Sequence, residues 1–217
     1  MRRVRVMIVA AAMCAPLLAS AALADPATPP REQDRSSPYM RVFGSTQPPY
    51  GFVEFCKRMP EECRQGPPEQ QERFSASPER LSELDVLNRA VNREIAPATD
   101  MEIYGVAEYW TIPTTRGDCE DYALLKRKRL IARGWPASSL LMTVVRDEKG
   151  EGHAVLTARI LQGDFILDNK VDEVKSWTRT RYEFIMRQSY IDPNNWLSLD
   201  PREGNPGLPI AGVRSQR

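Results

Sequence analysis

Histidine is nearly absent from this sequence. Among 217 residues there is one, His153, which excludes a zinc site built from several imidazoles and obliges any Cys-His or Ser-His chemistry to use that residue. A charge excess is also absent, because 30 basic residues against 29 acidic ones give a net charge of +1. Nucleic-acid-binding proteins normally carry a concentrated basic excess, so this balance argues against a nucleic-acid partner. The apolar fraction, 41%, is that of a globular protein.

The first 24 residues are typical of a cleaved signal peptide. Three arginines precede an apolar run over residues 6–23, and Ala22-Leu23-Ala24 supplies a small-x-small cleavage pattern. The alternative is a transmembrane anchor, but Pro16 breaks the run and a polar, proline-rich stretch follows it. We therefore expect cleavage after Ala24 and a periplasmic location.

Composition predicts three further segments. Residues 25–48 contain many prolines and polar side chains without periodicity, which favours a flexible linker. Residues 200–217 are similar and predict a disordered tail. The folded domain is then expected over residues 49–199.

After removal of Cys14 with the signal peptide, the chain keeps three cysteines. Disulfides persist in exported proteins, and an odd number leaves at least one thiol free. Cys56 and Cys63 are seven residues apart in one compact segment, so we expect them to form a disulfide. Cys119 then keeps its thiol.

Helices precede strands along the predicted domain. Ser77 and Pro78 are typical of a helix start, and an apolar face at three- and four-residue spacing continues until Pro97. A second helix is predicted from residue 118 or 119 to 133. Short apolar runs separated by turn residues then predict strands at 140–145, 153–160 and 165–167. Helices followed by an antiparallel meander indicate an α+β fold.

The second helix also carries a basic run, Lys126-Arg127-Lys128-Arg129. Such a run could attract an anionic partner, but a solvated helix face is the more common role. We interpret it as a solvated face.

Three residues have the types that thiol chemistry requires. Cys119 begins a helix, where unpaired backbone N–H groups and the helix dipole favour a thiolate. His153 begins a strand and is the available base, and Asp168 ends the next strand, where it can orient the imidazole. His153 lies ten residues before Gly163 at the turn and Asp168 five after it, so we expect a splay or bulge to bring them together. The alternative is a buried structural cysteine and an unrelated structural histidine.

The residues around these three resemble a known family. The segments Gly117-Asp118-Cys119-Glu120-Asp121-Tyr122-Ala123, Gly152-His153-Ala154-Val155-Leu156 and Leu167-Asp168-Asn169 are similar to motifs of the bacterial transglutaminase-like cysteine proteinases, whose best understood members are the LapG-type periplasmic proteases. The resemblance runs from about Tyr50 to Leu199. It implies a papain-like, transglutaminase-core fold, with the nucleophile at a helix N-terminus packed on an antiparallel sheet.

The same resemblance implies the role of each residue. Cys119 is expected to be the nucleophile, His153 the general base and acid, and Asp168 the residue that orients the imidazole. Asn169 is the alternative orienting residue, because papain-like sites use asparagine, but the family pattern favours Asp168.

Acidic residues flank the candidate nucleophile. Asp118, Glu120 and Asp121 oppose ionisation of the thiol, so either they pair with basic side chains or a cation neutralises them. Carboxylates suit Ca²⁺, although the sequence has no EF-hand loop. The resembled LapG-type enzymes depend on calcium through acidic residues beside the nucleophile, and Asp118 and Glu120 match those positions. The resemblance therefore implies a calcium site at Asp118 and Glu120.

The predicted function is an exported cysteine endopeptidase that acts on a protein substrate through an acyl-enzyme. The LapG-type enzymes release large surface adhesins under the control of an inner-membrane receptor for cyclic-di-GMP, so the resemblance implies an adhesin substrate and a receptor of that kind. One alternative is a transglutaminase, in which an amine captures the same acyl-enzyme. Another is a non-catalytic binding protein on the same fold, which would not need Cys119, His153 and Asp168 together.

Overall fold

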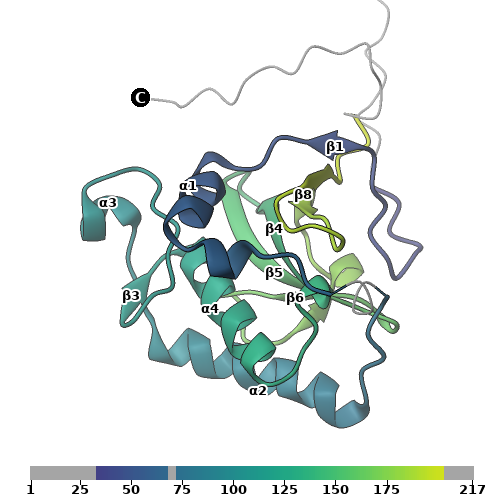
Figure 1. The fold of residues 1–217 in the computed structure, drawn as a ribbon. Helices are drawn as coiled ribbons and strands as arrows, with labels where there is room; N and C mark the ends of the chain where they lie inside the picture. The colour runs from purple at the N-terminus through teal and green to yellow at the C-terminus, as the bar shows by residue number, and fades with distance from the viewer. Residues whose placement is uncertain (1–32, 68–71, 203–217) are drawn as a thin grey trace, which may run out of the picture. The chain divides into compact units, whose positions relative to one another are not determined.

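The computed structural model describes residues 33–67 and 72–202. Within these ranges a seven-stranded antiparallel sheet has the order β1-β9-β8-β4-β5-β6-β7. Its strands are β1 Ser45–Thr46, β4 Leu140–Arg146, β5 Gly152–Ile160, β6 Gly163–Leu167, β7 Lys175–Ser176, β8 Glu183–Gln188 and β9 Trp196–Ser198. Figure 1 shows the long central strands β4 and β5 behind the helices.

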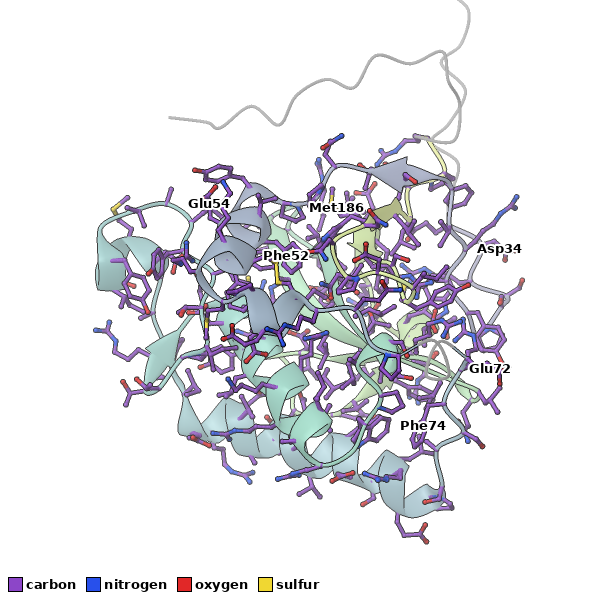
Figure 2. All side chains as sticks on the ribbon, in the orientation of Figure 1. Asp34, Phe52, Glu54, Glu72, Phe74 and Met186 are labelled. Carbon is purple, nitrogen blue, oxygen red and sulfur yellow. A yellow bond between two sulfur atoms is a disulfide. The ribbon has the colours of Figure 1, made fainter. Side chains whose placement is uncertain are left out.

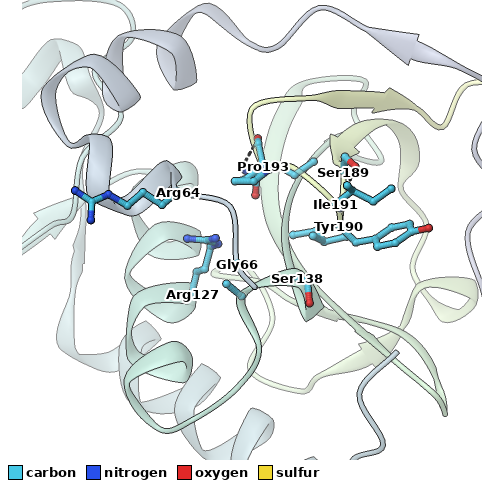
Figure 3. Close-up of a pocket in the computed structure, with 11 residues that line it drawn as sticks. Arg64, Gly66, Arg127, Ser138, Ser189, Tyr190, Ile191 and Pro193 are labelled. Carbon is cyan, nitrogen blue, oxygen red and sulfur yellow. Dashed lines mark hydrogen bonds between the residues drawn. The ribbon is translucent and has the colours of Figure 1, made fainter. Parts of the chain in front are cut away.

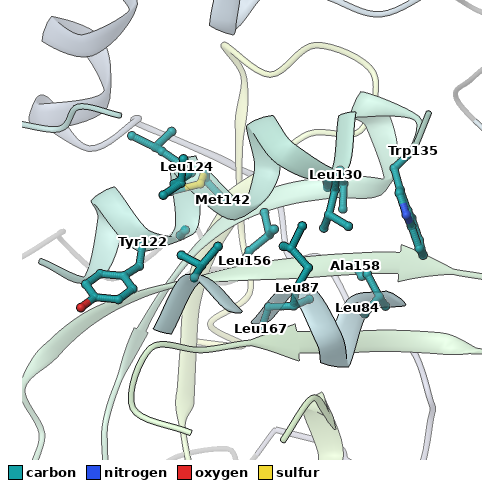
Figure 4. Packing of buried hydrophobic residues seen from close by; sticks show 14 of the residues in the cluster. Leu84, Leu87, Tyr122, Leu124, Leu130, Trp135, Met142, Leu156, Ala158 and Leu167 are labelled. Atoms are coloured by element: carbon teal, nitrogen blue, oxygen red, sulfur yellow. The ribbon is translucent and has the colours of Figure 1, made fainter. Parts of the chain in front are cut away.

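Two helices cover one face of this sheet. α2 spans Pro78–Glu94 and α4 spans Cys119–Ala132, and α4 packs on β4 and β5 while α2 contacts α4 and β6. Their apolar side chains meet those of the strands in the main core, part of which Figure 4 shows: Leu84, Leu87, Leu124, Leu130, Met142, Leu156 and Leu167. Burial of this apolar surface is the main stabilising contribution to the packing of helices on the sheet.

The helix boundaries follow from local sequence signals. The Ser77 hydroxyl accepts a hydrogen bond from the Arg80 amide, and Pro78 occupies the first position of α2. α4 is followed by Gly134, whose φ of 83° suits glycine. The two helices and three strands predicted from the sequence are therefore confirmed to within a few residues.

The basic run in α4 is not a solvated face. Lys126 is 0% exposed and Arg127 is 5% exposed, whereas Lys128 and Arg129 lie outside and pair with Glu62 and Glu94. The prediction of a solvated face was wrong for the first half of the basic run, Lys126 and Arg127. The first two turns of α4 are covered by the sheet, α2 and the segment around Glu62.

The other face of the sheet is covered by a segment that composition predicts to be a flexible linker. Among its described residues, Gln33 bonds the carbonyl oxygens of Phe184 and Leu199 at 2.6 and 2.8 Å, and Met40 is buried. These side chains help to enclose a second apolar cluster: Met40, Val145, Val155, Ile166, Trp177, Tyr182, Phe184 and Leu199. From residue 33 onward the segment is thus part of the fold, because it shields apolar side chains that would otherwise face water. The expected signal peptide and most of the expected tail lie outside the described residues.

α1, Tyr50–Arg58, joins the main core from the N-terminal side. Phe52 of α1 lies within the main core, whereas Glu54 lies on the outer side of the helix (Figure 2). A short 3₁₀ helix, Pro60–Cys63, follows, and a disulfide joins Cys56 to Cys63. The predicted pairing is therefore present in the structure, and Cys119 keeps a free thiol.

A small excursion separates α2 from α4. It contains β2 (Ala96–Pro97), α3 (Asp100–Tyr104) and β3 (Arg116–Gly117), and β2 pairs with β3 in parallel. Thr99 and Glu102 form a capping box at the start of α3. Within the described ranges, no helix is both long and apolar enough to cross a bilayer.

The disulfide should contribute measurably to stability. Replacing Cys56 and Cys63 together by alanine releases a short loop in the unfolded chain, so we expect the unfolding free energy to fall by about 2–3 kcal/mol. Urea denaturation of the oxidised protein and the double variant measures this difference. Mass spectrometry of the non-reduced protein is the control, and three free thiols or a disulfide to Cys119 would contradict the assignment.

Candidate active site

Cys119 is the first residue of α4 and lies beside the start of β5. The Ala154 amide donates a hydrogen bond to its sulfur, with N···Sγ 3.4 Å. Ala154 directly follows His153, so the helix N-terminus and the predicted base are brought to the same place. Gly117 makes room for this turn, since a Cβ there would lie 2.6 Å from a carboxylate oxygen of Asp121.

His153 and Asp168 form a buried pair. Nε2 of His153 lies 2.9 Å from Oδ1 of Asp168, and the two residues are 3% and 4% exposed. The β5–β6 pairing is continuous to Leu156↔Leu167, which places Asp168 diagonally across from His153 on the same face of the sheet. Side chains of this length span such a diagonal, so the splay or bulge expected from the sequence is not needed.

Asp168 accepts further hydrogen bonds. The Tyr182 hydroxyl donates to its Oδ2 at 2.5 Å, and the Lys170 amide donates to Oδ1 at 2.9 Å. Burial raises the pKa of Asp168, but these bonds and that to His153 outweigh burial, and the net pKa lies below its ordinary value. Asp168 is therefore an ionised acceptor that occupies Nε2 of the imidazole, and Nδ1 is the other ring nitrogen. Asn169 does not take this position, because Asp168 occupies Nε2.

Three carboxylates converge beside the nucleophile. Oxygen atoms of Asp100, Asp118 and Glu120 lie within 4.8 Å of one another, and Oε2 of Glu120 is 3.1 Å from the Cys119 sulfur. One oxygen of Asp100 and one of Asp118 are buried without a hydrogen-bond partner among the described residues. Asp121 points elsewhere, since its Oδ1 accepts from the Thr111 amide at 2.8 Å.

Burial and the neighbouring carboxylates oppose ionisation of the acidic groups and of the thiol in this site. Burial, with the nearby Asp118 charge, raises the pKa of Glu120 to about 9, and burial raises the pKa of Asp121 to about 8. Burial and the Glu120 carboxyl also raise the pKa of the Cys119 thiol well above its ordinary value. The helix terminus and the Ala154 amide favour a thiolate, but without a cation the burial and the carboxylates prevail.

The residues of the cluster fit a calcium ion. Hard oxygen ligands and concentrated negative charge are what Ca²⁺ requires, and the unpartnered oxygens of Asp100 and Asp118 are free to serve as ligands. Asp118 and Glu120 were candidates from the sequence, whereas Asp100 was missed. It lies 18 residues before Asp118, and only the return of the chain through α3 and β3 brings them together.

Tyr182 was also missed by sequence reasoning. Its hydroxyl bonds Asp168, and its ring lies edge-on to that of His153 with centroids 5.6 Å apart. No local motif marks it, because it lies in the irregular segment directly before β8 and reaches the site only through the pairing of β8 in the sheet.

A separate pocket lies near the end of α4 and the segment after β8 (Figure 3). Arg127, Ser138 and Tyr190 are among its lining residues, and none of the lining residues is a candidate site residue. The Arg127 guanidinium donates to the carbonyl oxygens of Leu140 and Glu62 at 3.1 Å each. We therefore assign this arginine a structural role.

Comparison of this chain with known protein families finds one that matches most of its length. Residues 42–204 match the family described as bacterial transglutaminase-like cysteine proteinase BTLCP. The match includes every residue of the site described above, from Asp100 to Tyr182. No curated protein matches the chain.

Solved structures of LapG from Legionella pneumophila are also similar. An EGTA-treated form has 25% identity and a TM-score of 0.43 over 49% of this chain and 61% of that chain, which is less than two thirds of its length. A second LapG structure has 23% identity and a TM-score of 0.46 over 56% of this chain and 71% of that chain. A calcium-bound form has 24% identity and a TM-score of 0.41 over 49% of this chain and 68% of that chain.

The raised carboxyl pKa values predict a pH-dependent stability. Between about pH 5 and pH 7, Glu120 and Asp121 hold protons in the folded state that they lose in the unfolded chain, so rising pH favours unfolding. We expect the melting temperature in EGTA to fall across this interval. Glu120→Gln removes one such group and should make the fall smaller, whereas a melting temperature equal at both ends of the interval would contradict these pKa shifts.

Proposed function

The chain belongs to the bacterial transglutaminase-like cysteine proteinase family, and from that premise we propose that it is an exported endopeptidase with a Cys119–His153–Asp168 triad. The observation that carries this proposal is the convergence of three elements. The sulfur at the start of α4 lies on the amide that follows His153, and His153 is bound through Nε2 to an ionised Asp168.

The chemistry assigns one task to each group. His153 takes the thiol proton, and the Cys119 sulfur attacks the carbonyl carbon of the scissile peptide bond. The protonated imidazole then gives its proton to the departing amine, and water, deprotonated by His153, hydrolyses the thioester and restores the thiol. Asp168, held by Tyr182, keeps the imidazole in the orientation and tautomer that this exchange needs.

We extend the proposal to a calcium ion held by Asp100, Asp118 and Glu120. A bound cation supplies positive charge that compensates these carboxylates and favours the thiolate. The carboxylates are supplied by α3 and by the turn that begins α4. The ion would therefore also hold the segment between α2 and α4, which carries Asp100, in place beside the nucleophile. The calcium-bound LapG of Legionella pneumophila is a similar protein with this ion.

The location and partners are proposed from the sequence, the disulfide and the family resemblance. The arginines and apolar run at the chain start favour export to the periplasm, and the disulfide suits an oxidising compartment. The substrate is proposed to be a protein, with a surface adhesin as the candidate suggested by resemblance to LapG-type proteases. A receptor for cyclic-di-GMP is proposed as a regulator on the same ground.

Substitution of the triad tests the peptidase. Cys119→Ala should abolish cleavage of a peptide library, His153→Ala should reduce it by about 10³-fold or more, and Asp168→Ala should cost somewhat less, because residues that act as a unit are not additive. Mass spectrometry of the products measures both rate and chemistry. Isopeptide products would identify a transglutaminase instead, and turnover by Cys119→Ala would contradict the thiol mechanism.

Removal of calcium tests whether the carboxylates bind this ion and whether cleavage depends on it. EGTA should suppress cleavage and lower the melting temperature, since calcium at about 100 times its Kd adds about 2.7 kcal/mol to the stability of a state that alone binds it. Magnesium should rescue poorly, because it demands a tighter octahedral shell. The double variant Asp118→Asn, Glu120→Gln should bind calcium much more weakly.

Glu173→Gln is the matched control for this experiment, because Glu173 is exposed and lies outside the cluster. It should respond to calcium as the unchanged protein does. If chelation leaves both the rate and the melting temperature of the unchanged protein as they were, the ion is excluded while the thiol mechanism is not.

A further inference from the structure

An arginine outside the matched family region bonds three backbone carbonyl groups close to the candidate site. Arg35 precedes the family match, which begins at residue 42. Its Nη2 donates to the Tyr182 carbonyl oxygen at 2.6 Å. Its Nη1 donates to the carbonyl oxygens of Thr180 and Trp177, the latter at 3.5 Å. Because a guanidinium is a planar fork of fixed donors, Arg35 can fix the relative positions of these carbonyl groups.

The segment that Arg35 bonds has no regular strand pairing at its end. It begins with a short 3₁₀ helix, Trp177–Arg179, and leads into β8. The pairing of β8 with β4 begins at Glu183, so the Tyr182 carbonyl lies just outside that ladder. Its hydrogen bond comes from the Arg35 side chain instead of from a neighbouring strand.

Gln33 acts in the same way two residues earlier in the chain. Its amide donates to the Phe184 carbonyl oxygen at 2.6 Å and accepts from the Phe184 amide at 3.2 Å, which are the two bonds that a neighbouring strand would make. The same Nε2 donates to the Leu199 carbonyl oxygen, directly after β9, at 2.8 Å. Gln33 and Arg35 are half-buried, whereas Asp34 between them is exposed. Both side chains therefore hold the chain from Tyr182 to Phe184 at the point where β9 has ended.

Tyr182 links this anchor to the triad. Its backbone is bonded by Arg35, while its hydroxyl donates to Oδ2 of Asp168 at 2.5 Å. Its ring lies edge-on to that of His153, with centroids 5.6 Å apart. A tyrosine side chain has two rotatable bonds and a rigid ring, so the place of its hydroxyl follows the place of its backbone. A shift of the Tyr182 backbone would thus move the donor that Asp168 depends on.

We propose that Arg35 is a positioning residue for the triad: by bonding the carbonyl groups of residues 177, 180 and 182 it sets the place of the Tyr182 hydroxyl, which orients Asp168 behind His153. The inference rests on the proposed function for the meaning of the Asp168–His153 pair. The position of Tyr182 is nevertheless measurable without turnover, so failure of the peptidase and failure of this inference are distinguishable.

The single histidine of the chain provides the direct test of position. With phenylalanine and tryptophan rings deuterated, a nuclear Overhauser cross-peak from the ring of His153 to a tyrosine ring reports its distance from Tyr182. Arg35→Met keeps an unbranched stem of similar reach but removes all donors, so this cross-peak should weaken severalfold in the folded variant. A cross-peak of unchanged intensity would overturn the proposal.

The kinetic test separates positioning from substrate binding. For a peptide that the unchanged protein cleaves, Arg35→Met should lower kcat by about 10-fold and change KM by less than about twofold, because the acid behind the base is misplaced. Arg41→Met is the matched control, since Arg41 is exposed in the same segment and lies over the Phe43 ring. It should keep both the kcat and the cross-peak. A loss in Arg41→Met equal to that in Arg35→Met would refute the specific role.

A double-mutant cycle tests whether Arg35 acts through the Tyr182 hydroxyl. Tyr182→Phe lacks this hydroxyl, so adding Arg35→Met to it should lower kcat by only about twofold or less. Equal factors in the two backgrounds would show that Arg35 acts elsewhere, and the proposal would fall.

Arg35→Lys covers the case in which Arg35→Met does not fold. It keeps the charge and most of the stem, but one ammonium replaces the fork that bonds three carbonyl groups. We expect a weaker cross-peak and a lower kcat than in the unchanged protein, measured at a temperature at which both proteins are folded. Full intensity together with full kcat in Arg35→Lys would contradict the proposal.

Discussion

The packing of the α4 N-terminus against the start of β5 is the contact on which the candidate site depends. It places the Cys119 sulfur on the Ala154 amide, one residue from His153. Apolar side chains of α4 and the strands fix this docking, and a slip by one helical turn would move the sulfur by about 5.4 Å. The β5–β6 register then adds Asp168 to His153. Because Cys119, His153 and Asp168 lie on or directly beside regular elements, the geometry of the proposed triad is fixed by the same packing that forms the core.

The buried charges on and beside α4 are arranged in a way that lowers the stability of the fold. Carboxylates of Asp100, Asp118 and Glu120 crowd the end that carries the nucleophile, and the unpartnered ammonium of Lys126 is buried two turns later. Each costs desolvation free energy that an apolar side chain would not. Departures of this kind from local rules tend to occur at functional sites. For the acids beside the thiol, the proposed calcium ion supplies the chemical rationale, because a divalent cation offsets their charge.

Much of this arrangement could be predicted from the sequence because its signals are local. The cap at Ser77 and the apolar spacing after it predicted α2, and turn residues predicted β4 to β6. The motif around Cys119 predicted a nucleophile and the count of one histidine predicted its base, and the structure places Cys119 on the amide that follows His153. Asp100 and Tyr182 could not be found in this way, because the return of the chain through α3 and the pairing of β8 bring them to the site. Lys126 was misread for a related reason: a charge run looks solvated until the neighbours that cover it are known. Proline content likewise suggested a linker where tertiary contacts hold residues 33–48 on the sheet.

The pH dependence of Cys119 alkylation in saturating calcium tests the central claim most directly, with His153→Ala as the reference. The claim is that Cys119 is a nucleophile activated by His153. It predicts that iodoacetamide reacts with the unchanged protein at pH values below the ordinary thiol range of about 8.5, and that His153→Ala lacks this reaction. The disulfide protects the other two cysteines of the described chain, so labelling reports on Cys119. Identical profiles for the two proteins, each rising only above that range, would contradict the account.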